Sequence, residues 1–209
     1  MAGEVRLRVT AKAADEATAA ALCDKMVAAI RETPVAPHIY GIDTPSPEAA
    51  LIELLKTRGL TVATAESCTG GLIAKRLTDV AGCSDVVAGG AVTYQTREKT
   101  AILGVDPALI EAHTVVSEQV AIAMARGAIA AFDVDTAIAT TGYAGPGGGT
   151  EQDPVGTVYI AVAHRDRVQY RRLSLSSHRD RAYIRTVAAT NAILDLWRLL
   201  NGADTAEKQ

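Results

Sequence analysis

The fold is decided at residues 60–80, which read LTVATAESCTGGLIAKRLTDV. Its first residues, Leu60 to Thr64, form a short apolar run that is typical of a buried strand. From Thr69 to Val80 the apolar residues recur at helical spacing instead. Two adjacent glycines lie where one pattern gives way to the other, as expected for a tight turn. This strand–helix step predicts an α/β domain.

The same alternation continues on both sides of this step. Upstream, Ser46 and Pro47 are typical of a helix start, and Gly59 is typical of the position just past a helix end. Downstream, the periodicity predicts a strand over 85–95, a helix from 117, a strand from 134, a hairpin of strands 155–163 and 168–175, and a helix over 181–200. Helices alternating with strands, plus one hairpin, predict a three-layer α/β/α sandwich around a mixed β-sheet.

The residues before this domain predict a small β-α-β appendage. VRLRVT at 5–10 alternates apolar and polar residues like a half-buried strand, residues 15–30 have helical spacing, and HIYGI at 38–42 resembles a second strand. A proline-rich linker, Thr44-Pro45-Ser46-Pro47, follows. We therefore expect an appendage at 1–43, the main domain at 44–202 and a flexible tail at 203–209.

The amino-acid composition excludes several classes of function. The chain has 209 residues with 24 acidic and 21 basic side chains, and its net charge of −3 argues against a broad nucleic-acid or anionic-membrane surface. Three widely spaced cysteines form no CxxC pair, and the N-terminus lacks the apolar core of a signal peptide. We expect a soluble cytoplasmic protein with reduced thiols. The four histidines show no ligand spacing, so no metal site is expected.

The first candidate for chemistry is Ser67, in AESCTGG at the strand–helix step. A helix start offers free N–H groups and a positive dipole end, so the amides near residues 68–71 are candidate oxyanion donors. Alternatively, a serine or threonine merely caps the helix. The stretch is not a GxSxG elbow, and the neighbouring Cys68 is a rival nucleophile without an obvious histidine partner.

A second candidate pair follows the next predicted strand. Tyr94 lies at the strand end, and Lys99 comes five residues later. If the strands before Ser67 and Tyr94 are parallel, both end at the same sheet edge, where open α/β sheets bind ligands. Lys99 is a candidate base for Ser67 if burial lowers its pKa, and Tyr94 is a candidate for holding or relaying the proton. Alternatively, Tyr94 is an aromatic residue at the rim of the core and Lys99 is a solvated surface charge.

A third candidate is the glycine-rich loop at residues 140–150, TTGYAGPGGGT. Its glycines allow backbone N–H groups to converge on a phosphate, although it has neither a P-loop ending nor a GxGxxG spacing. A flexible connection is the alternative. Arg179 and Arg181, at the entry to the last helix, are candidate phosphate contacts or ordinary exposed charges.

Taken together, the order and spacing of AESCTGGLIAKRLTDVAGCS, GGAVTYQTREKTAILGV, HTVVSEQVAIAMARGA, ATTGYAGPGGGT and DPVGTVYIAVA resemble the C-terminal domain of the CinA family, over roughly residues 46–200. The resemblance implies hydrolysis of the carboxamide of nicotinamide mononucleotide to nicotinate mononucleotide and ammonia, without metal or cofactor, by a homo-oligomer. It assigns the nucleophile to Ser67 and its support to Tyr94 and Lys99. The expected substrate contacts are Thr69, Gly70, Gly71, Thr141, Gly142, Gly145, Gly147, Gly148 and Arg181.

The sequence departs from the family pattern at two places. Gln95 and Thr96 replace the usual Ser-Asn after the tyrosine, and Arg179 replaces a glycine before the last helix. A catalytically impaired nucleotide-binding or scaffolding module is therefore an alternative. The first 42 residues resemble the end of the KH-like connecting domain of long CinA proteins, but they lack the GXXG clamp that would favour RNA binding.

Overall fold

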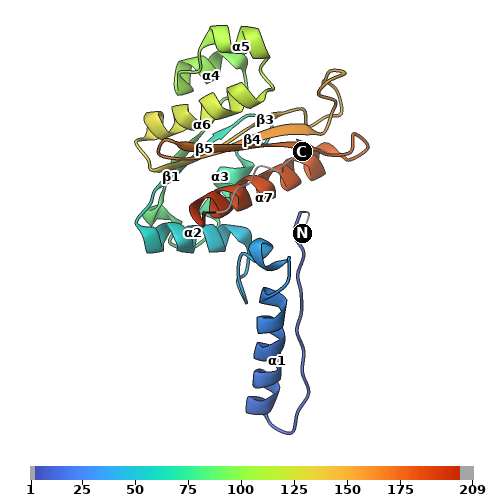
Figure 1. Cartoon of the computed structure of the whole chain (residues 1–209). Coiled ribbons are helices and arrows are strands. Elements are labelled where there is room, and N and C mark those ends of the chain that lie inside the picture. Colours follow the sequence, from blue (N-terminus) through green and yellow to red (C-terminus); the bar gives the residue numbers. More distant parts are fainter. Residues whose placement is uncertain (1–2, 203–209) are drawn as a thin grey trace.

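The computed structural model describes residues 3–202, in which five strands form one mixed sheet (Figure 1). The strand order is β2-β1-β3-β4-β5. Strands β2, β1 and β3 are parallel, with β2 at the edge of the sheet, whereas β4 and β5 extend the sheet as an antiparallel hairpin. The strands are β1 (Val62–Glu66), β2 (Val87–Val92), β3 (Thr136–Gly142), β4 (Thr157–His164) and β5 (Arg167–Ser174).

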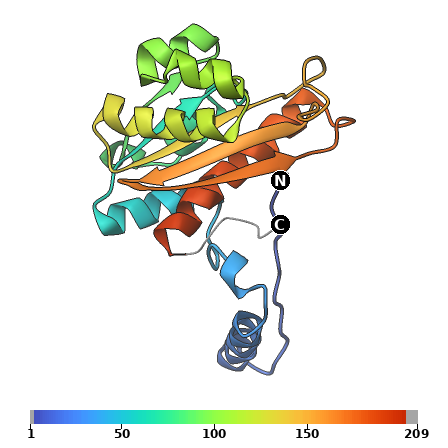
Figure 2. The same ribbon diagram turned by 45° about the horizontal axis from the view of Figure 1, so that its top comes forward.

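Helices cover both faces of this sheet (Figures 1 and 2). Helix α6 packs along one face with α4 and α5 outside it, and α3 and α7 pack on the other face with α2 beside α7. The helices are α1 (Glu16–Arg31), α2 (Pro47–Arg58), α3 (Leu72–Thr78), α4 (Thr96–Leu103), α5 (Pro107–His113), α6 (Glu118–Phe132) and α7 (Arg181–Leu200), with 3-10 turns η1 (Ala36–His38) and η2 (Cys83–Asp85). The predicted three-layer α/β/α fold is confirmed.

Each sheet face has its own apolar core. Large side chains from α2, α3 and α7 meet one face, whereas the face under α6 is packed mainly by alanines with Met124 and Val120. The small side chains let α6 lie close to the strands, and they bring α4, which carries Lys99, near the end of β1. Core packing thus determines where the side chains of α4 can reach.

The predicted ends of α2 are confirmed, whereas the predicted start of α3 is wrong. Helix α2 is capped by Ser46, whose Oγ accepts from the amide of Ala49, and it ends at Gly59 in the left-handed conformation, as predicted. Helix α3 begins at Leu72, three residues later than the periodicity predicts. The reason is that Gly70 and Gly71 adopt φ values of +61° and +89°, which exclude them from a right-handed helix.

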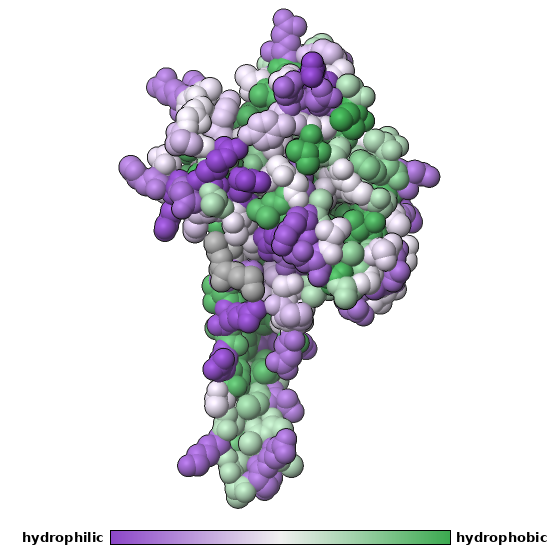
Figure 3. Space-filling model, turned by 180° about the vertical axis from the view of Figure 1, so that it is seen from behind, coloured by the Kyte–Doolittle hydropathy of each residue, from purple (hydrophilic) through white to green (hydrophobic). Residues whose placement is uncertain are grey.

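The β-α-β prediction for the appendage is wrong in its two strands. Residues 5–10 and 38–42 form no strand, although the helix between them is present as α1. None of the described strands pairs with residues 5–10, and the side chains of Val5 and Leu7 are exposed. Helix α1 buries no residue, and hydrophobic side chains gather on this projecting part of the molecule (Figure 3). The predicted tail at 203–209 lies outside the described residues.

Gly127 sets the distance between α6 and α4. A Cβ atom at this position would lie 2.0 Å from the carbonyl oxygen of Leu103, the last residue of α4. We expect Gly127→Ala to lower the free energy of unfolding by about 1–3 kcal/mol, because overpacking outweighs the better helix propensity of alanine. Chemical denaturation measures this change. Gly147→Ala is the control, since no atom lies within 4 Å of its added Cβ. Equal stability of the two variants would contradict the prediction.

Candidate active site

Ser67 lies at the carboxyl end of the central strand of the parallel group. Strand β1 ends at Glu66, and the amide of Ser67 donates to the carbonyl of Thr140 on β3 at 3.0 Å. The amide of Thr93, just past β2, donates to the carbonyl of Glu66 at 2.9 Å. The serine is therefore held from both neighbouring strands, at the sheet edge where ligands bind in open α/β folds.

The lysine predicted as its base does reach the serine. Lys99 lies on α4 and its side chain is fully buried. Its Nζ donates to Ser67 Oγ at 3.2 Å and to the Thr93 carbonyl at 2.6 Å. Burial lowers the pKa of Lys99 below that of an ordinary lysine, and no described carboxylate forms an ion pair with it. An amine in such a place can become neutral and accept a proton.

The buried carboxylate of Glu66 occupies the start of α3. Its Oε2 accepts from the amides of Gly71 at 2.9 Å and Ile73 at 3.1 Å, and its Oε1 accepts from Ala74 at 2.8 Å. A ligand anion therefore has no access to this helix start. Sequence reasoning missed the role of Glu66, although a charged residue at the end of a buried strand was a signal.

Two of the proposed oxyanion donors are consequently committed elsewhere. The amide of Gly71 binds Glu66, and that of Gly70 donates to the carbonyl of Ser67 at 3.1 Å. No other residue in the described range accepts a hydrogen bond from the amides of Cys68 or Thr69. The set of candidate oxyanion donors thus narrows to these two residues, which directly follow the serine.

The neighbouring thiol is unsuited to attack a carbonyl. Cys68 is 5% exposed, and burial raises its pKa to about 12. The thiolate, which is the reactive form, is therefore essentially absent at neutral pH. Of the two adjacent candidates, Ser67 is the one with a base.

Tyr94 takes a different position from the one expected of a proton relay. It is 57% exposed, and its hydroxyl accepts from Arg181 Nη2 at 2.7 Å. Arg181 Nη1 also donates to the carbonyl of Gly145 at 2.7 Å. These bonds join the end of β2, the start of α7 and the glycine loop. No hydrogen bond connects Tyr94 with the Ser67–Lys99 pair among the described residues.

A cavity of about 190 Å³ opens beside the serine. The predicted site residues that line it are Ser67, Tyr94, Thr141, Gly142 and Arg181. Lys99 is not part of the lining, but it contacts Ser67, which is. The remaining lining comes from Cys68, Thr96, Val115, Val116, Tyr143 and Ala144.

The other predicted substrate contacts lie outside this lining. Thr69 is fully buried, and its hydroxyl shares a hydrogen bond with that of Thr140. Gly145 takes part through its carbonyl, which binds Arg181. Gly70, Gly71, Gly147 and Gly148 are not part of the lining either.

Arg185 is a second site cation that the sequence reasoning missed. Its Nε and Nη2 donate to the carbonyl of Thr69 at 3.1 and 2.6 Å, which holds the loop after the serine. Arg185 follows Arg181 by four residues, a spacing that places both on one face of α7. No described carboxylate pairs with either guanidinium. Their positive charge is therefore available to an anionic ligand.

The departures from the family pattern leave this geometry intact. Gln95 is the N-cap residue of α4, and Thr96 begins that helix. The guanidinium of Arg179 stacks over the ring of Tyr183, 4.6 Å from its centre. None of the three displaces Lys99 or Arg181 from the contacts described above.

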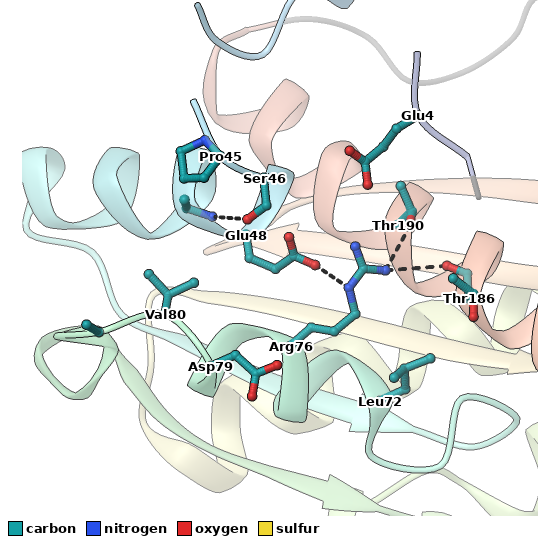
Figure 4. A pocket seen from close by; sticks show the side chains of 12 residues that line it. Glu4, Pro45, Ser46, Glu48, Leu72, Arg76, Asp79, Val80, Thr186 and Thr190 are labelled. Carbon is teal, nitrogen blue, oxygen red and sulfur yellow. Dashed lines mark hydrogen bonds and ion pairs between the residues drawn. The ribbon is translucent and has the colours of Figure 1, made fainter. Parts of the chain in front are cut away.

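A larger cavity of about 620 Å³ lies elsewhere, between the N-terminal segment, α2, α3 and α7 (Figure 4). Its polar centre is Arg76, which forms a largely buried ion pair with Glu48 and donates to the hydroxyl of Thr190 at 2.8 Å. The cavity contains neither a serine–lysine pair nor the glycine loop. We assign it a structural role in joining three helices.

Comparison with known proteins identifies the class of this α/β domain. Residues 45–200 match the family described as CinA C-terminal domain, so the chain belongs to the CinA family. A CinA-like protein of Synechocystis is 41% identical over 202 residues, and one of Myxococcus xanthus is 46% identical over 156 residues. These alignments cover 96% and 74% of this chain, but only 48% and 37% of the relatives. The chain thus spans about half the length of the curated relatives it matches, or less.

Solved structures show the same domain. The competence/damage inducible protein CihA of Agrobacterium tumefaciens is 38% identical with a TM-score of 0.69, and the match covers 77% of this chain and 99% of that one. A CinA superfamily protein of Escherichia coli is 32% identical with a TM-score of 0.68, over 80% of this chain and 99% of that one.

Among residues 3–202, no helix is long and apolar enough to span a membrane. In the same range, no group of three or more His, Cys, Asp or Glu is placed to hold a metal ion.

Proposed function

We propose that the chain hydrolyses the carboxamide of nicotinamide mononucleotide, giving nicotinate mononucleotide and ammonia. The observation that carries this proposal is the 3.2 Å contact between the partly buried Ser67 Oγ and the Nζ of the fully buried Lys99. A serine next to a lysine of lowered pKa is an arrangement for acyl transfer. Membership of the CinA family supports the same reaction class.

In the proposed first half-reaction, neutral Lys99 takes the proton of the Ser67 hydroxyl as Oγ bonds to the carboxamide carbon. The negative charge that develops on the carboxamide oxygen is stabilised by the free amides of Cys68 and Thr69. Lys99 then gives its proton to the leaving nitrogen, the C–N bond breaks, and ammonia departs. The product of this stage is an ester of Ser67 with the nicotinate ring.

The charge around the cavity supports an anionic substrate. Arg181 and Arg185 have no carboxylate partner among the described residues, and Arg181 lies on the cavity lining. A volume of 190 Å³ is below the roughly 300 Å³ at which pockets enclose a whole small ligand. We therefore propose that the ring and carboxamide enter, while the ribose and phosphate lie at the rim beside Arg181.

The proposal is tested by incubating the purified chain with nicotinamide mononucleotide and measuring ammonia and nicotinate mononucleotide. We expect both products in equal amounts. Binding detected by calorimetry without ammonia release would instead identify a non-catalytic nucleotide-binding module. We also propose cytoplasmic action as a homo-oligomer, and sedimentation measures its oligomeric state.

Arg181 should determine affinity for the phosphate. We expect Arg181→Met to raise KM for nicotinamide mononucleotide about tenfold to hundredfold, because a charge-assisted hydrogen bond to the phosphate is lost. Steady-state kinetics measures this change. Arg179→Met is the matched control, since that guanidinium stacks on Tyr183 outside the cavity. An equal rise of KM in both variants would contradict the assignment.

A further inference from the structure

We propose that the hydroxyl of Thr93 holds the water that hydrolyses the acyl-enzyme. This inference rests on the proposed function and extends it to the second half-reaction. Thr93 directly follows β2 and is fully buried. Its Oγ1 has no hydrogen-bond partner among the residues that the structure describes. A buried hydroxyl without a partner is costly and calls for an explanation.

Chain geometry places this hydroxyl on the same sheet face as Ser67. Burial alternates along the end of β2 and just beyond it: Ala91 and Thr93 are buried, whereas Val92 and Tyr94 are exposed. Successive side chains of an extended chain point to opposite faces, so Thr93 shares the face of Ala91. Ala91 and Ala65 belong to the core under α6. By the same alternation from Ala65, Ser67 also faces that side.

Backbone contacts bring Thr93 and Ser67 next to each other. The amide of Thr93 donates to the carbonyl of Glu66, the residue before the serine. The carbonyl of Thr93 accepts from Lys99 Nζ at 2.6 Å, and the same Nζ donates to Ser67 Oγ at 3.2 Å. Thr93 thus supplies two groups near the serine–lysine pair: a carbonyl that orients the amine and a hydroxyl without a protein partner.

The second half-reaction needs a water molecule at this place. The water oxygen bonds to the ester carbon and gives one proton to neutral Lys99. The tetrahedral intermediate then collapses, the bond from carbon to Ser67 Oγ breaks, and Lys99 returns that proton to Oγ. Nicotinate mononucleotide leaves as the carboxylate after losing the acid proton to solvent. A buried water needs two to four polar partners, and Thr93 Oγ1 with Lys99 Nζ supplies two.

The test is Thr93→Val, which replaces the hydroxyl by a methyl group of similar size. If Thr93 acts on the second half-reaction, kcat and KM should both fall about tenfold, the scale of one lost hydrogen bond, and kcat/KM should stay within about twofold. Rapid-quench measurements should show a burst of one ammonia per active site, and intact-mass analysis should detect the accumulated acyl-enzyme. Thr93→Ser, which keeps the hydroxyl, should restore turnover.

Thr157→Val is the matched control. Thr157 is 1% exposed and its Oγ1 also lacks a partner within the described range, but it lies on β4, which does not pair with β1. We expect wild-type kinetics from this variant. An unchanged kcat in Thr93→Val, or a fall in kcat/KM at constant KM, would overturn the inference. A wild-type chain that releases no ammonia would overturn the proposed function as well, so the two failures are distinguishable.

Discussion

Ser67→Ala should lower the rate of ammonia release by a factor on the order of 10⁵ or more. The reason is that the covalent route is lost entirely, because alanine has no atom that can form the acyl-enzyme. Losses of this size are typical when the nucleophile of a serine hydrolase is removed. The same steady-state assay measures the loss, and intact-mass analysis should show no ester on the variant.

Cys68 provides the control for this experiment. Cys68→Ala removes a thiol whose pKa is about 12, so turnover should stay within about tenfold of wild type. The backbone amide that we propose as an oxyanion donor remains in this variant. Wild-type turnover in Ser67→Ala would exclude the serine hydroxyl as the nucleophile. A loss of turnover in Cys68→Ala alone would assign that role to the thiol.

Lys99→Met should lower kcat/KM by about 10²- to 10⁴-fold, the usual contribution of a general base. Methionine fills a similar volume but cannot take the serine proton. The wild-type pH profile offers a second readout. Burial lowers the pKa of Lys99, so the neutral amine forms at a lower pH than in an exposed lysine. Activity should rise tenfold per pH unit below that pKa and reach a plateau above it.

Lys99→Arg is the control that separates charge from base chemistry. A guanidinium stays protonated throughout the accessible pH range, so this variant keeps the cation but supplies no base. Its activity should be as low as that of Lys99→Met, and the rising limb at the lysine pKa should disappear. A pH profile identical to wild type would exclude Lys99 as the base.

The alternation of elements was predictable because each helix and strand carries its own periodicity. Helix α2 shows this most clearly, since Ser46 and Gly59 mark both ends. The appendage shows the limit of such reasoning. Residues 5–10 have the alternation of a strand, but a strand also needs a partner strand beside it, and none of the described strands pairs with this segment. Periodicity records which side chains prefer burial, not whether a neighbour is present.

The sequence predicted part of the geometry of the candidate site, whereas the roles of its residues stay a proposal. Ser67 and Lys99 meet as predicted, since parallel strands bring their carboxyl ends together. The side chain of Tyr94 points to the sheet face opposite to that of Thr93, because successive side chains of an extended segment alternate between the two faces. The spacing of the motif alone does not reveal this difference. The contacts of Glu66 and Arg185 depend on side chains that turn back onto a backbone loop, and no sequence pattern specifies that path.

The carboxylate of Glu66 bears on how the product leaves. On the proposed reaction, hydrolysis creates a carboxylate beside Ser67, and an open helix start would retain such an anion. Glu66 already accepts from three amides there, so the chain itself competes with the product for that position. On this proposal, the site favours the neutral amide group over the acid product, and inhibition by accumulated nicotinate mononucleotide should be weak.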